Sequence, residues 1–317
     1  MGNSPSSMPN PSAMAVQGTV NLSGASAKPV IAGMVAPGQL GGIRNTHPPL
    51  ESIVGGERFL LKTKDGFSLD ALYVKSQCDE KNPRGALCFH GNGEYLDGME
   101  KFASFYLSRN VSVLLITMRG YPGSEGDVRN EGEPGIYLDV AASVDYMIDK
   151  GFLPTDLIAH GFSLGGSLAS AAAVHHELGA LVLDHTFTSA SQVARPKAVK
   201  IVSNISKWIP AWVGSSIAQG AMDATFQSGV DVDLGHGRSV KTDGLSSVDK
   251  VKKYQGSLVV CYGTADHIMP VSFADDFEHA YKGERFTRIE IKGKGHNDPY
   301  LGNEELSERL SVALGLK

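Results

Sequence analysis

The order of hydrophobic and polar positions predicts strands that alternate with helices along most of the chain. Apolar residues at every second position on both sides of Asp65-Gly66 predict an antiparallel hairpin over residues 57–63 and 67–74. Continuous apolar runs predict further strands over residues 85–90, 111–118, 157–159, 181–184, 257–262 and 288–291. Helical spacing or small helix-forming residues predict helices over residues 94–109, 135–150, 164–178, 271–281 and 304–314. This alternation predicts an α/β fold, with a mostly parallel sheet covered by helices on both faces and ligands bound at the carboxyl ends of the strands.

Residues 1–50 differ from the rest of the chain. They are rich in Ser, Pro, Gly, Asn and Met, contain no Asp or Glu, and carry only Lys28 and Arg44 as cations. Such a segment buries little apolar surface and is predicted to be a disordered tail, which leaves residues 51–317 as one domain. It lacks the basic stretch and the continuous apolar stretch of a secretory signal peptide.

Two alternatives to a plain flexible tail stay open. Met1-Gly2-Asn3-Ser4-Pro5-Ser6 fits the short N-myristoylation pattern, in which Gly2 is exposed after Met1 is removed. The Ser- and Asn-rich composition is also similar to that of the uncleaved leaders of bacterial type III effectors. The first alternative predicts attachment to a membrane, and the second predicts export into another cell by a route other than the Sec pathway.

Composition and charge narrow the classes of function. A length of 317 residues allows one large domain with a sizeable core, and a net charge of −5 gives no support for a nucleic-acid partner. No apolar run approaches the roughly 20 residues that cross a bilayer. The cysteines Cys78, Cys88 and Cys261 are too few for a disulfide framework. Cys88 and Cys261 lie in strand-like runs, where a free cysteine is usually a small buried hydrophobe, so we expect a reducing compartment such as the cytoplasm.

The predicted strand at residues 157–159 leads into Gly161-Phe162-Ser163-Leu164-Gly165, and a helix-forming segment follows. This G-x-S-x-G pattern between a strand and a helix is typical of a nucleophilic serine. The glycines permit a tight turn, which places Ser163 at the start of a helix, where developing negative charge is stabilised. A helix that simply begins with a serine cap would give the same five residues, so the pentapeptide alone leaves both interpretations open.

Reactive side chains follow three of the predicted strands. They are Ser163, then Asp266 after the strand at residues 257–262, and His296 after the last strand. A serine hydroxyl is a poor nucleophile at neutral pH and needs a base, and the base needs a carboxylate that fixes its tautomer. The carboxyl ends of neighbouring parallel strands lie together, so these three groups can converge without being close in sequence. Their order along the chain is that of α/β-hydrolases.

These residues, together with three loop motifs, resemble the α/β-hydrolase-domain serine hydrolases, and more narrowly the branch of Bem46-like proteins and protein depalmitoylases. The motifs are His90-Gly-Asn-Gly, Arg119-Gly-Tyr-Pro-Gly-Ser-Glu-Gly and Gly295-His-Asn-Asp, and the likeness covers residue 57 to the C-terminus. The resemblance implies an oxyanion hole built from the N–H groups of Asn92 and Leu164. It implies no metal and no organic cofactor. The chain departs from the family at Gly93, where Ala is frequent, and at His267.

Several other polar residues have a structural interpretation. Asp298 could compete with Asp266 as the partner of His296, but its position favours capping of the last loop. We expect His90 to order the oxyanion loop and His160 to be a hydrogen-bonded core residue. Asp184-His185 ends a strand, and loop hydrogen bonding is the default expectation there.

The insertion at residues 189–248 is the part of the chain expected to select the substrate. Its first part predicts a small amphipathic helical cap with Trp208 and Trp212 toward the active site or a membrane surface, although packing on the core fits equally well. Residues 227–247 are polar and Gly-rich and predict a mobile loop at the pocket mouth. Tyr121 joins Trp208 and Trp212 as a candidate substrate contact.

The sequence therefore predicts hydrolysis of an acyl ester or thioester through an acyl-enzyme, with a lipid or a lipidated protein among the candidate substrates. Ser163 is the nucleophile, His296 the base and Asp266 its orienting carboxylate, so activity should rise with pH as His296 loses its proton. Alternatives are a serine aminopeptidase or amidase on the same residues, and an exported effector whose hydrolase fold mainly binds a partner. No obligate protein partner is indicated, and peripheral contact with a membrane is a further expectation.

Overall fold

The structure is a computed structural model that describes residues 47–77, 83–192, 226–298 and 300–316. The tail up to residue 46 lies outside the described residues, as does the predicted cap with Trp208 and Trp212. Within the described ranges, no helix is long and apolar enough to cross a membrane.

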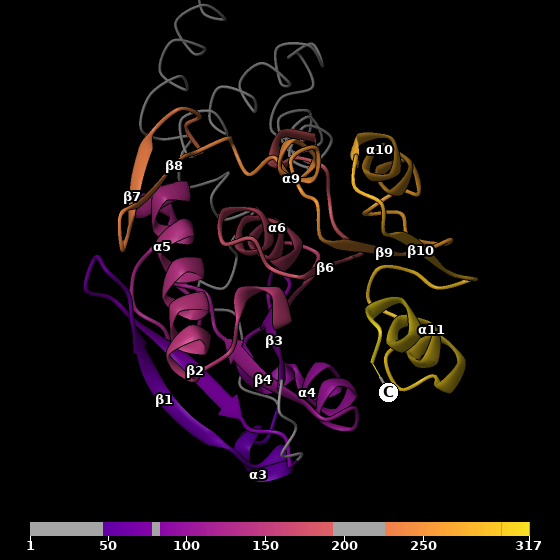
Figure 1. The fold of residues 1–317 in the computed structure, drawn as a ribbon, viewed down its shortest axis with the longest axis horizontal. Helices are drawn as coiled ribbons and strands as arrows, with labels where there is room; N and C mark the ends of the chain where they lie inside the picture. The colour runs from indigo at the N-terminus through magenta and orange to yellow at the C-terminus, as the bar shows by residue number, and fades with distance from the viewer. Residues whose placement is uncertain (1–46, 78–82, 193–225, 299, 317) are drawn as a thin grey trace, which may run out of the picture.

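One eight-stranded sheet forms the centre of the molecule, with the strand order β1-β2-β4-β3-β5-β6-β9-β10 (Figure 1). The strands are β1 (Glu57–Lys62), β2 (Ser68–Val74), β3 (Arg84–Phe89), β4 (Val111–Ile116), β5 (Leu157–Phe162), β6 (Ala180–Asp184), β9 (Ser257–Gly263) and β10 (Phe286–Ile291). Strand β2 pairs antiparallel with both of its neighbours, and all other pairings are parallel. The predicted hairpin and the predicted, mostly parallel sheet are confirmed.

Helices cover both faces of this sheet, as predicted. The helices are α3 (Glu51–Val54), α4 (Glu100–Leu107), α5 (Val128–Asp149), α6 (Gly165–His175), α9 (Ser247–Val251), α10 (Ser272–Ala280) and α11 (Glu304–Leu314), with short 3-10 turns at Leu96–Gly98 and Pro154–Asp156. Helices α5, α6, α9 and α10 share one hydrophobic cluster with the sheet, whereas α4 and α11 share the other. Successive strand residues belong to opposite clusters: Leu87 and Phe89 face α5 and α6, and Ala86 and Cys88 face α4. The continuous apolar runs of the sequence are therefore strands buried on both faces.

Two helices differ from their predicted bounds. The helix predicted over residues 94–109 begins at Glu100, because a 3-10 turn at Leu96–Gly98 precedes it. That turn is held from outside: Leu96 N–H donates to Thr117 Oγ1, and the Asp97 carboxylate accepts from Leu50 N–H and from Arg58. Helix α5 starts earlier than predicted, at Val128, and bends at Gly132, which has a φ of 59°.

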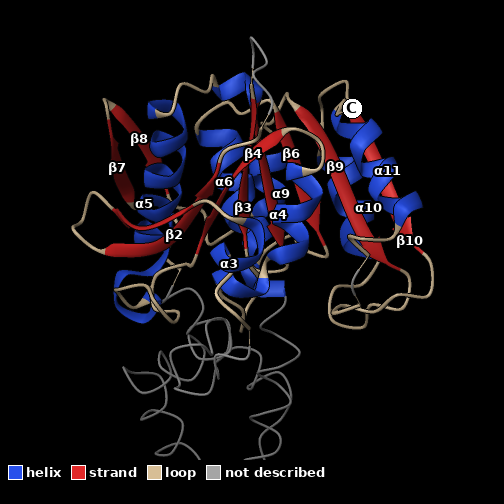
Figure 2. Cartoon of the chain, turned by 90° about the horizontal axis from the view of Figure 1, so that it is seen from below, coloured by secondary structure: helices blue, strands red, loops and turns tan. Residues whose placement is uncertain are grey.

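The prediction of a mobile loop over residues 227–247 is wrong, because an ordered hairpin occupies this segment. Strands β7 (Asp231–Gly235) and β8 (Arg238–Lys241) pair with each other and lie beside α5 (Figure 2). Val232 and Leu234 are buried against the core, and Arg238 donates to both carboxylate oxygens of Asp145 on α5 at 2.6 and 2.8 Å. The alternating burial of two apolar residues, together with one bidentate ion pair, holds this hairpin in place. The polar composition of the segment gave no indication of this structure.

Candidate active site

Ser163 occupies a sharp turn between β5 and α6, and its own backbone is in the left-handed region with a φ of 51°. The turn requires glycine on both sides. A Cβ at Gly161 would lie 2.0 Å from the carbonyl oxygen of Gly165, and a Cβ at Gly165 would lie 2.1 Å from that of Phe89. Ser163 N–H donates to the Asp184 carbonyl at 2.8 Å, which ties the turn to β6. The strained conformation expected of a nucleophile in this turn is therefore held by backbone contacts.

Ser163, His296 and Asp266 form one hydrogen-bonded chain, although they are far apart in sequence. His296 Nε2 lies 3.0 Å from Ser163 Oγ, and His296 Nδ1 lies 2.8 Å from Asp266 Oδ2. The other carboxylate oxygen of Asp266 accepts from the N–H groups of Ile268 and Met269, both at 2.8 Å. Asp266 is thereby oriented on both oxygens, so His296 donates from Nδ1 and presents Nε2 as an acceptor to the serine hydroxyl.

The charge of Asp266 is stabilised inside the protein. Its burial alone would raise the pKa of the carboxyl group, but the hydrogen bonds from His296 and from the backbone of Met269 and Ile268 lower it below the usual value. Asp266 is therefore an anion at neutral pH and favours a positive charge on the imidazole beside it.

The loop after β3 passes close to the serine. A Cβ at Gly91 would lie 2.7 Å from the Phe162 ring and 3.5 Å from Ser163 Cβ. His90 is buried, donates from Nδ1 to the Gly91 carbonyl at 2.8 Å and accepts from Met118 N–H at 3.0 Å. Burial lowers the pKa of His90 to about 4, so it is neutral and its interpretation as an ordering residue is confirmed. Asn92 follows Gly91 in this loop, and Leu164 directly follows the serine, which is where the sequence places the two oxyanion donors.

Tyr121 lies behind this loop. Its side chain is only 2% exposed, and its hydroxyl donates to Asn92 Oδ1 at 2.7 Å. The ring also packs edge-on against His90. Tyr121 supports the loop after β3, and its contact with a substrate stays a prediction.

Asp298 caps the last loop, as predicted. Its Oδ2 accepts from Gly295 N–H at 2.7 Å, one residue before His296. The carboxylate that hydrogen-bonds His296 is that of Asp266.

A buried cluster that sequence reasoning took for ordinary loop contacts lies directly behind the site. We call it the Asp184 cluster, and it comprises His160, Asp184, His185 and Tyr300. Asp184 accepts from the Tyr300 hydroxyl at 2.9 Å, from His185 Nδ1 at 2.6 Å and from His160 Nε2 at 3.4 Å. The His185 ring meets the His296 ring edge-on, with 6.0 Å between centroids. The only signal for it in the sequence is an Asp-His pair at a strand end.

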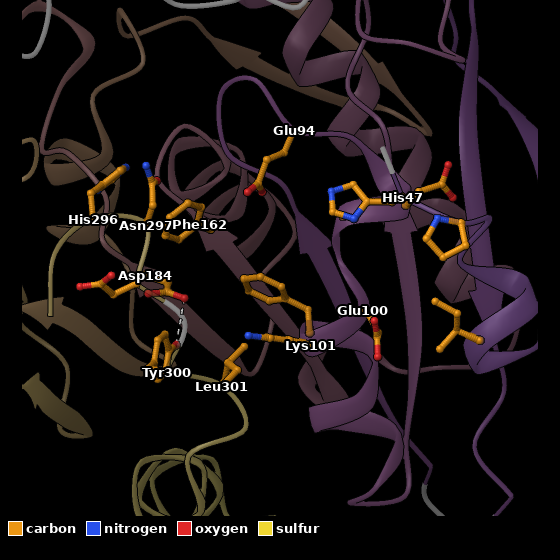
Figure 3. Close-up of a pocket in the computed structure, with 16 residues that line it drawn as sticks. His47, Glu94, Glu100, Lys101, Phe162, Asp184, His296, Asn297, Tyr300 and Leu301 are labelled. Carbon is orange, nitrogen blue, oxygen red and sulfur yellow. Dashed lines mark hydrogen bonds between the residues drawn. The ribbon is translucent and has the colours of Figure 1, made fainter. Parts of the chain in front are cut away.

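A pocket of about 360 Å³ lies beside His296. Figure 3 shows His296 and Asn297 on one side of it and His47 on the other, with Glu94 between them. Phe102, Phe162 and Leu301 contribute apolar surface. Sequence reasoning missed this pocket, because its walls come from five separate segments of the chain. Within the described ranges, no group of three His, Cys, Asp or Glu residues is placed to hold a metal ion.

Comparison with known proteins agrees with this fold. The model of the alpha/beta hydrolase family matches residues 86–309. The esterase Pf2001 of Pyrococcus furiosus superposes with a TM-score of 0.62 at 16% identity, over 86% of this chain and 95% of that chain, a likeness that shows the fold.

Two relatives support the narrower resemblance. The protein bem46 of Schizosaccharomyces pombe is 31% identical over 154 residues, which is 47% of this chain and 50% of that protein, so the match spans half the length of that relative. The human alpha/beta hydrolase domain-containing protein 17B is 24% identical over 261 residues, covering 80% of this chain and 73% of its own length. The predicted likeness to the Bem46-like branch is confirmed. Since the family match extends over most of the chain and the sheet has the expected topology, this chain belongs to the alpha/beta hydrolase family.

Proposed function

We propose that the protein is a serine hydrolase that cleaves an acyl ester or thioester through an acyl-enzyme. The observation that carries this proposal is the continuous chain of hydrogen bonds from Asp266 through His296 to Ser163 Oγ. A serine held at 3.0 Å from an oriented imidazole is the arrangement that activates a hydroxyl for attack on an acyl carbon.

The first half of the reaction transfers the acyl group to the enzyme. Ser163 Oγ attacks the acyl carbon while its proton moves to His296 Nε2, and the carbonyl π electrons move onto oxygen. The N–H groups of Leu164 and Asn92 are the donors proposed for that oxyanion, and each such donor typically contributes about 100- to 1,000-fold in rate. The intermediate collapses when the bond to the leaving oxygen or sulfur breaks and His296 returns the proton to that atom.

The second half regenerates the enzyme by the same route. A water molecule gives its proton to His296 Nε2 and attacks the acyl carbon, and the intermediate then expels Ser163 Oγ, which recovers the proton. Asp266 stabilises the imidazolium in both halves, because its depressed pKa keeps it anionic while His296 carries the proton.

The proposal is tested with p-nitrophenyl esters from acetyl to palmitoyl, using the wild type and Ser163→Ala. We expect turnover in the wild type and a fall of about 10,000-fold or more in the variant, because the nucleophile is lost. Ser170→Ala is the matched control: this buried serine on α6 donates only to the Ser167 carbonyl within the helix. A fluorophosphonate probe should label the wild type and Ser170→Ala but not Ser163→Ala.

The result that contradicts the proposal is equally plain. Wild-type protein with a folded circular-dichroism spectrum that neither hydrolyses any of these esters nor takes up the probe would exclude an active serine hydrolase. The chain-length optimum of an active enzyme separates small esters from long-chain lipids and lipidated proteins as substrates.

A further inference from the structure

The pocket beside His296 is lined by the imidazole that protonates the leaving group in the proposed reaction. In the proposed reaction His296 Nε2 returns its proton to the leaving oxygen or sulfur, so that atom must lie next to this imidazole. His296 and its neighbour Asn297 line the pocket directly, and the Phe162 ring, 5.2 Å from the His296 ring between centroids, lines it beside them. A group attached to the leaving atom can therefore extend from His296 into this cavity.

The cavity has an apolar floor and a volume that suits an organic group. Phe102, Phe162 and Leu301 provide the apolar surface. A volume of about 360 Å³ falls within the range of small-molecule sites, which are mostly apolar with a few convergent polar groups. Aromatic rings on such a floor also attract cations through their faces.

The charge of the walls is predominantly negative. Among the residues that the structure describes, the carboxylates of Glu94, Glu100 and Asp298 line the pocket together with one lysine, Lys101. Two further carboxylates that touch it, Asp97 and Asp184, are already satisfied by Arg58 and by the Asp184 cluster, respectively.

Glu94 is an acid of this pocket on which the charge of His296 acts. It follows the loop of Asn92, and the titratable groups that act on its pKa are His47, His296 and Asp184. Burial raises the pKa of Glu94, whereas a hydrogen bond with the Gly91 backbone and the charges of His47 and His296 act to lower it, so among the described residues its negative charge is only partly compensated. A positively charged ligand group beside it would supply that compensation.

We propose that this pocket binds the leaving group of the acyl substrate and selects an alcohol or thiol that carries an ammonium or guanidinium group. The inference rests on the proposed function and names the half of the substrate that the pocket recognises. The apolar floor holds the carbon skeleton of the leaving group, and Glu94 faces its cation. When the C–O or C–S bond breaks, the electron pair stays on the departing atom, His296 protonates it, and the released alcohol or thiol lies in the pocket.

The test compares leaving groups of equal shape and different charge at one acyl chain. Butyrylthiocholine carries a quaternary ammonium, and the butyryl thioester of 3,3-dimethylbutane-1-thiol is its neutral isostere. We expect the wild type to prefer the cationic thioester by about tenfold in kcat/KM, which is the effect of one favourable charge contact of moderate strength. The preference should reside mainly in KM and should shrink as salt is added, because screening weakens it.

Variants assign the preference to the pocket. Glu94→Gln should reduce the ratio of cationic to neutral kcat/KM to about one, and the neutral thioester measured in the same variant corrects for any general loss. Lys101→Met removes the opposing charge at an exposed position and should raise the ratio. Glu57→Gln, an exposed acid at the start of β1, is the charge-matched control and should leave the ratio unchanged.

Two sources of such a leaving group are separated by a second pair of substrates. These are S-butyryl thioesters of an N-acetylated Cys-Lys amide and of its Cys-norleucine counterpart. A larger preference for the basic dipeptide than for thiocholine assigns the site to acylated peptides, and the reverse assigns it to a small amino alcohol or aminothiol.

Equal kcat/KM for cationic and neutral thioesters, or a preference that survives Glu94→Gln, overturns the inference. Turnover of p-nitrophenyl esters would then still support the proposed function. Absence of turnover on every ester and thioester, by contrast, removes both.

Discussion

Two Asp–His pairs lie at the carboxyl end of the sheet, and they differ in where the second imidazole nitrogen points. Asp266 and His296 come from the loops after β9 and β10, and His296 Nε2 reaches Ser163 Oγ at 3.0 Å. Asp184 and His185 are consecutive residues after β6, and His185 Nδ1 binds Asp184 Oδ1 at 2.6 Å. Among the described residues, His185 Nε2 is buried with no hydrogen-bond partner. One pair faces a nucleophile, whereas the other faces the core.

The backbone explains the difference. His185 has a φ of 47°, a left-handed conformation that turns its ring back onto the preceding residue. His296 instead approaches a carboxylate 30 positions away in sequence, so its far nitrogen is free to point at the turn after β5. The chemistry of the two pairs is the same, and the direction imposed by the chain decides which one can act as a base.

The carboxylates are also used differently. Asp266 divides its oxygens between His296 and two backbone N–H groups, which orients one imidazole. Asp184 is fully buried and accepts from three side chains, two of them histidines. Burial alone would raise the pKa of Asp184, but the hydrogen bonds from His160 and His185 lower it far below the usual value. The first carboxylate therefore serves catalysis in the proposed reaction, and the second serves stability.

The largest effect that separates the pairs is on turnover. Asp266→Asn should lower kcat/KM for a short-chain ester by about 10,000-fold, because the amide favours the imidazole tautomer that cannot accept the serine proton. Asp184→Asn should lower it by less than about tenfold, since His296 keeps its carboxylate. Steady-state hydrolysis of p-nitrophenyl butyrate across pH 5–9 measures both. Equal losses in the two variants would place Asp184 in the catalytic machinery.

The order of the two variants reverses when the free energy of unfolding is measured, because Asp184→Asn is then expected to have the larger effect. Asp184→Asn should reduce the free energy of unfolding by about 3 kcal/mol, because it leaves buried donors without an anionic partner. Asp266→Asn should cost less, since two of the three groups that donate to Asp266 are the backbone N–H groups of Ile268 and Met269, which an amide oxygen can still accept. Urea unfolding followed by circular dichroism gives both values.

The decrease in the free energy of unfolding at low pH checks the same assignment. The pKa of Asp184 is lower in the folded state than in the unfolded chain, so its contribution is fully present above the unfolded value of about 4 and is lost as the pH falls below it. The wild type should therefore lose more stability than Asp184→Asn between pH 5 and pH 2. Parallel curves for the two proteins would contradict a stabilising role for this carboxylate.

The sequence predicted the triad because each member lies in the segment that follows a strand. In a parallel sheet the strand ends meet at one edge, so Ser163, Asp266 and His296 could be brought together without knowledge of any contact. The same logic failed for Asp184, since its role depends on Tyr300, 116 positions away, and on His160 inside β5. Those partners emerge only from packing.

Regions with a weak periodic signal were the least predictable. The β7–β8 hairpin has just two buried apolar residues on β7, Val232 and Leu234, among Asp and Gly. Its position is decided by the ion pair between Arg238 and Asp145, which no local pattern encodes. The pocket beside His296 was not predicted for a similar reason, because no local pattern encodes it. Glu94, at the end of the loop after β3, was the residue in the sequence that pointed to it. A carboxylate next to an oxyanion loop is a candidate for substrate contact in any such sequence.

The smallest expected effect concerns the charge of His185. Burial alone would lower the pKa of this imidazole, but the hydrogen bond and the charge of Asp184, with Asp266 and Asp298 nearby, raise it above its usual value. Its pKa is thus higher in the folded state than in the unfolded chain. The resulting stability is fully present below the unfolded value of about 6.5 and is lost as the pH rises through the folded value.

His185→Gln should remove that dependence, so the wild type should lose about 1 kcal/mol more than the variant as the pH is raised from 6 to 9. His175→Gln gives the opposite sign. Burial lowers the pKa of His175 to about 4, so the wild type loses stability relative to this variant as the pH falls below about 6.5. Urea unfolding at several pH values distinguishes the two histidines. If the wild type and His185→Gln showed the same pH dependence between pH 6 and pH 9, His185 would be neutral in the folded protein, and its bond to Asp184 would hold the ring in place without contributing a charge behind His296.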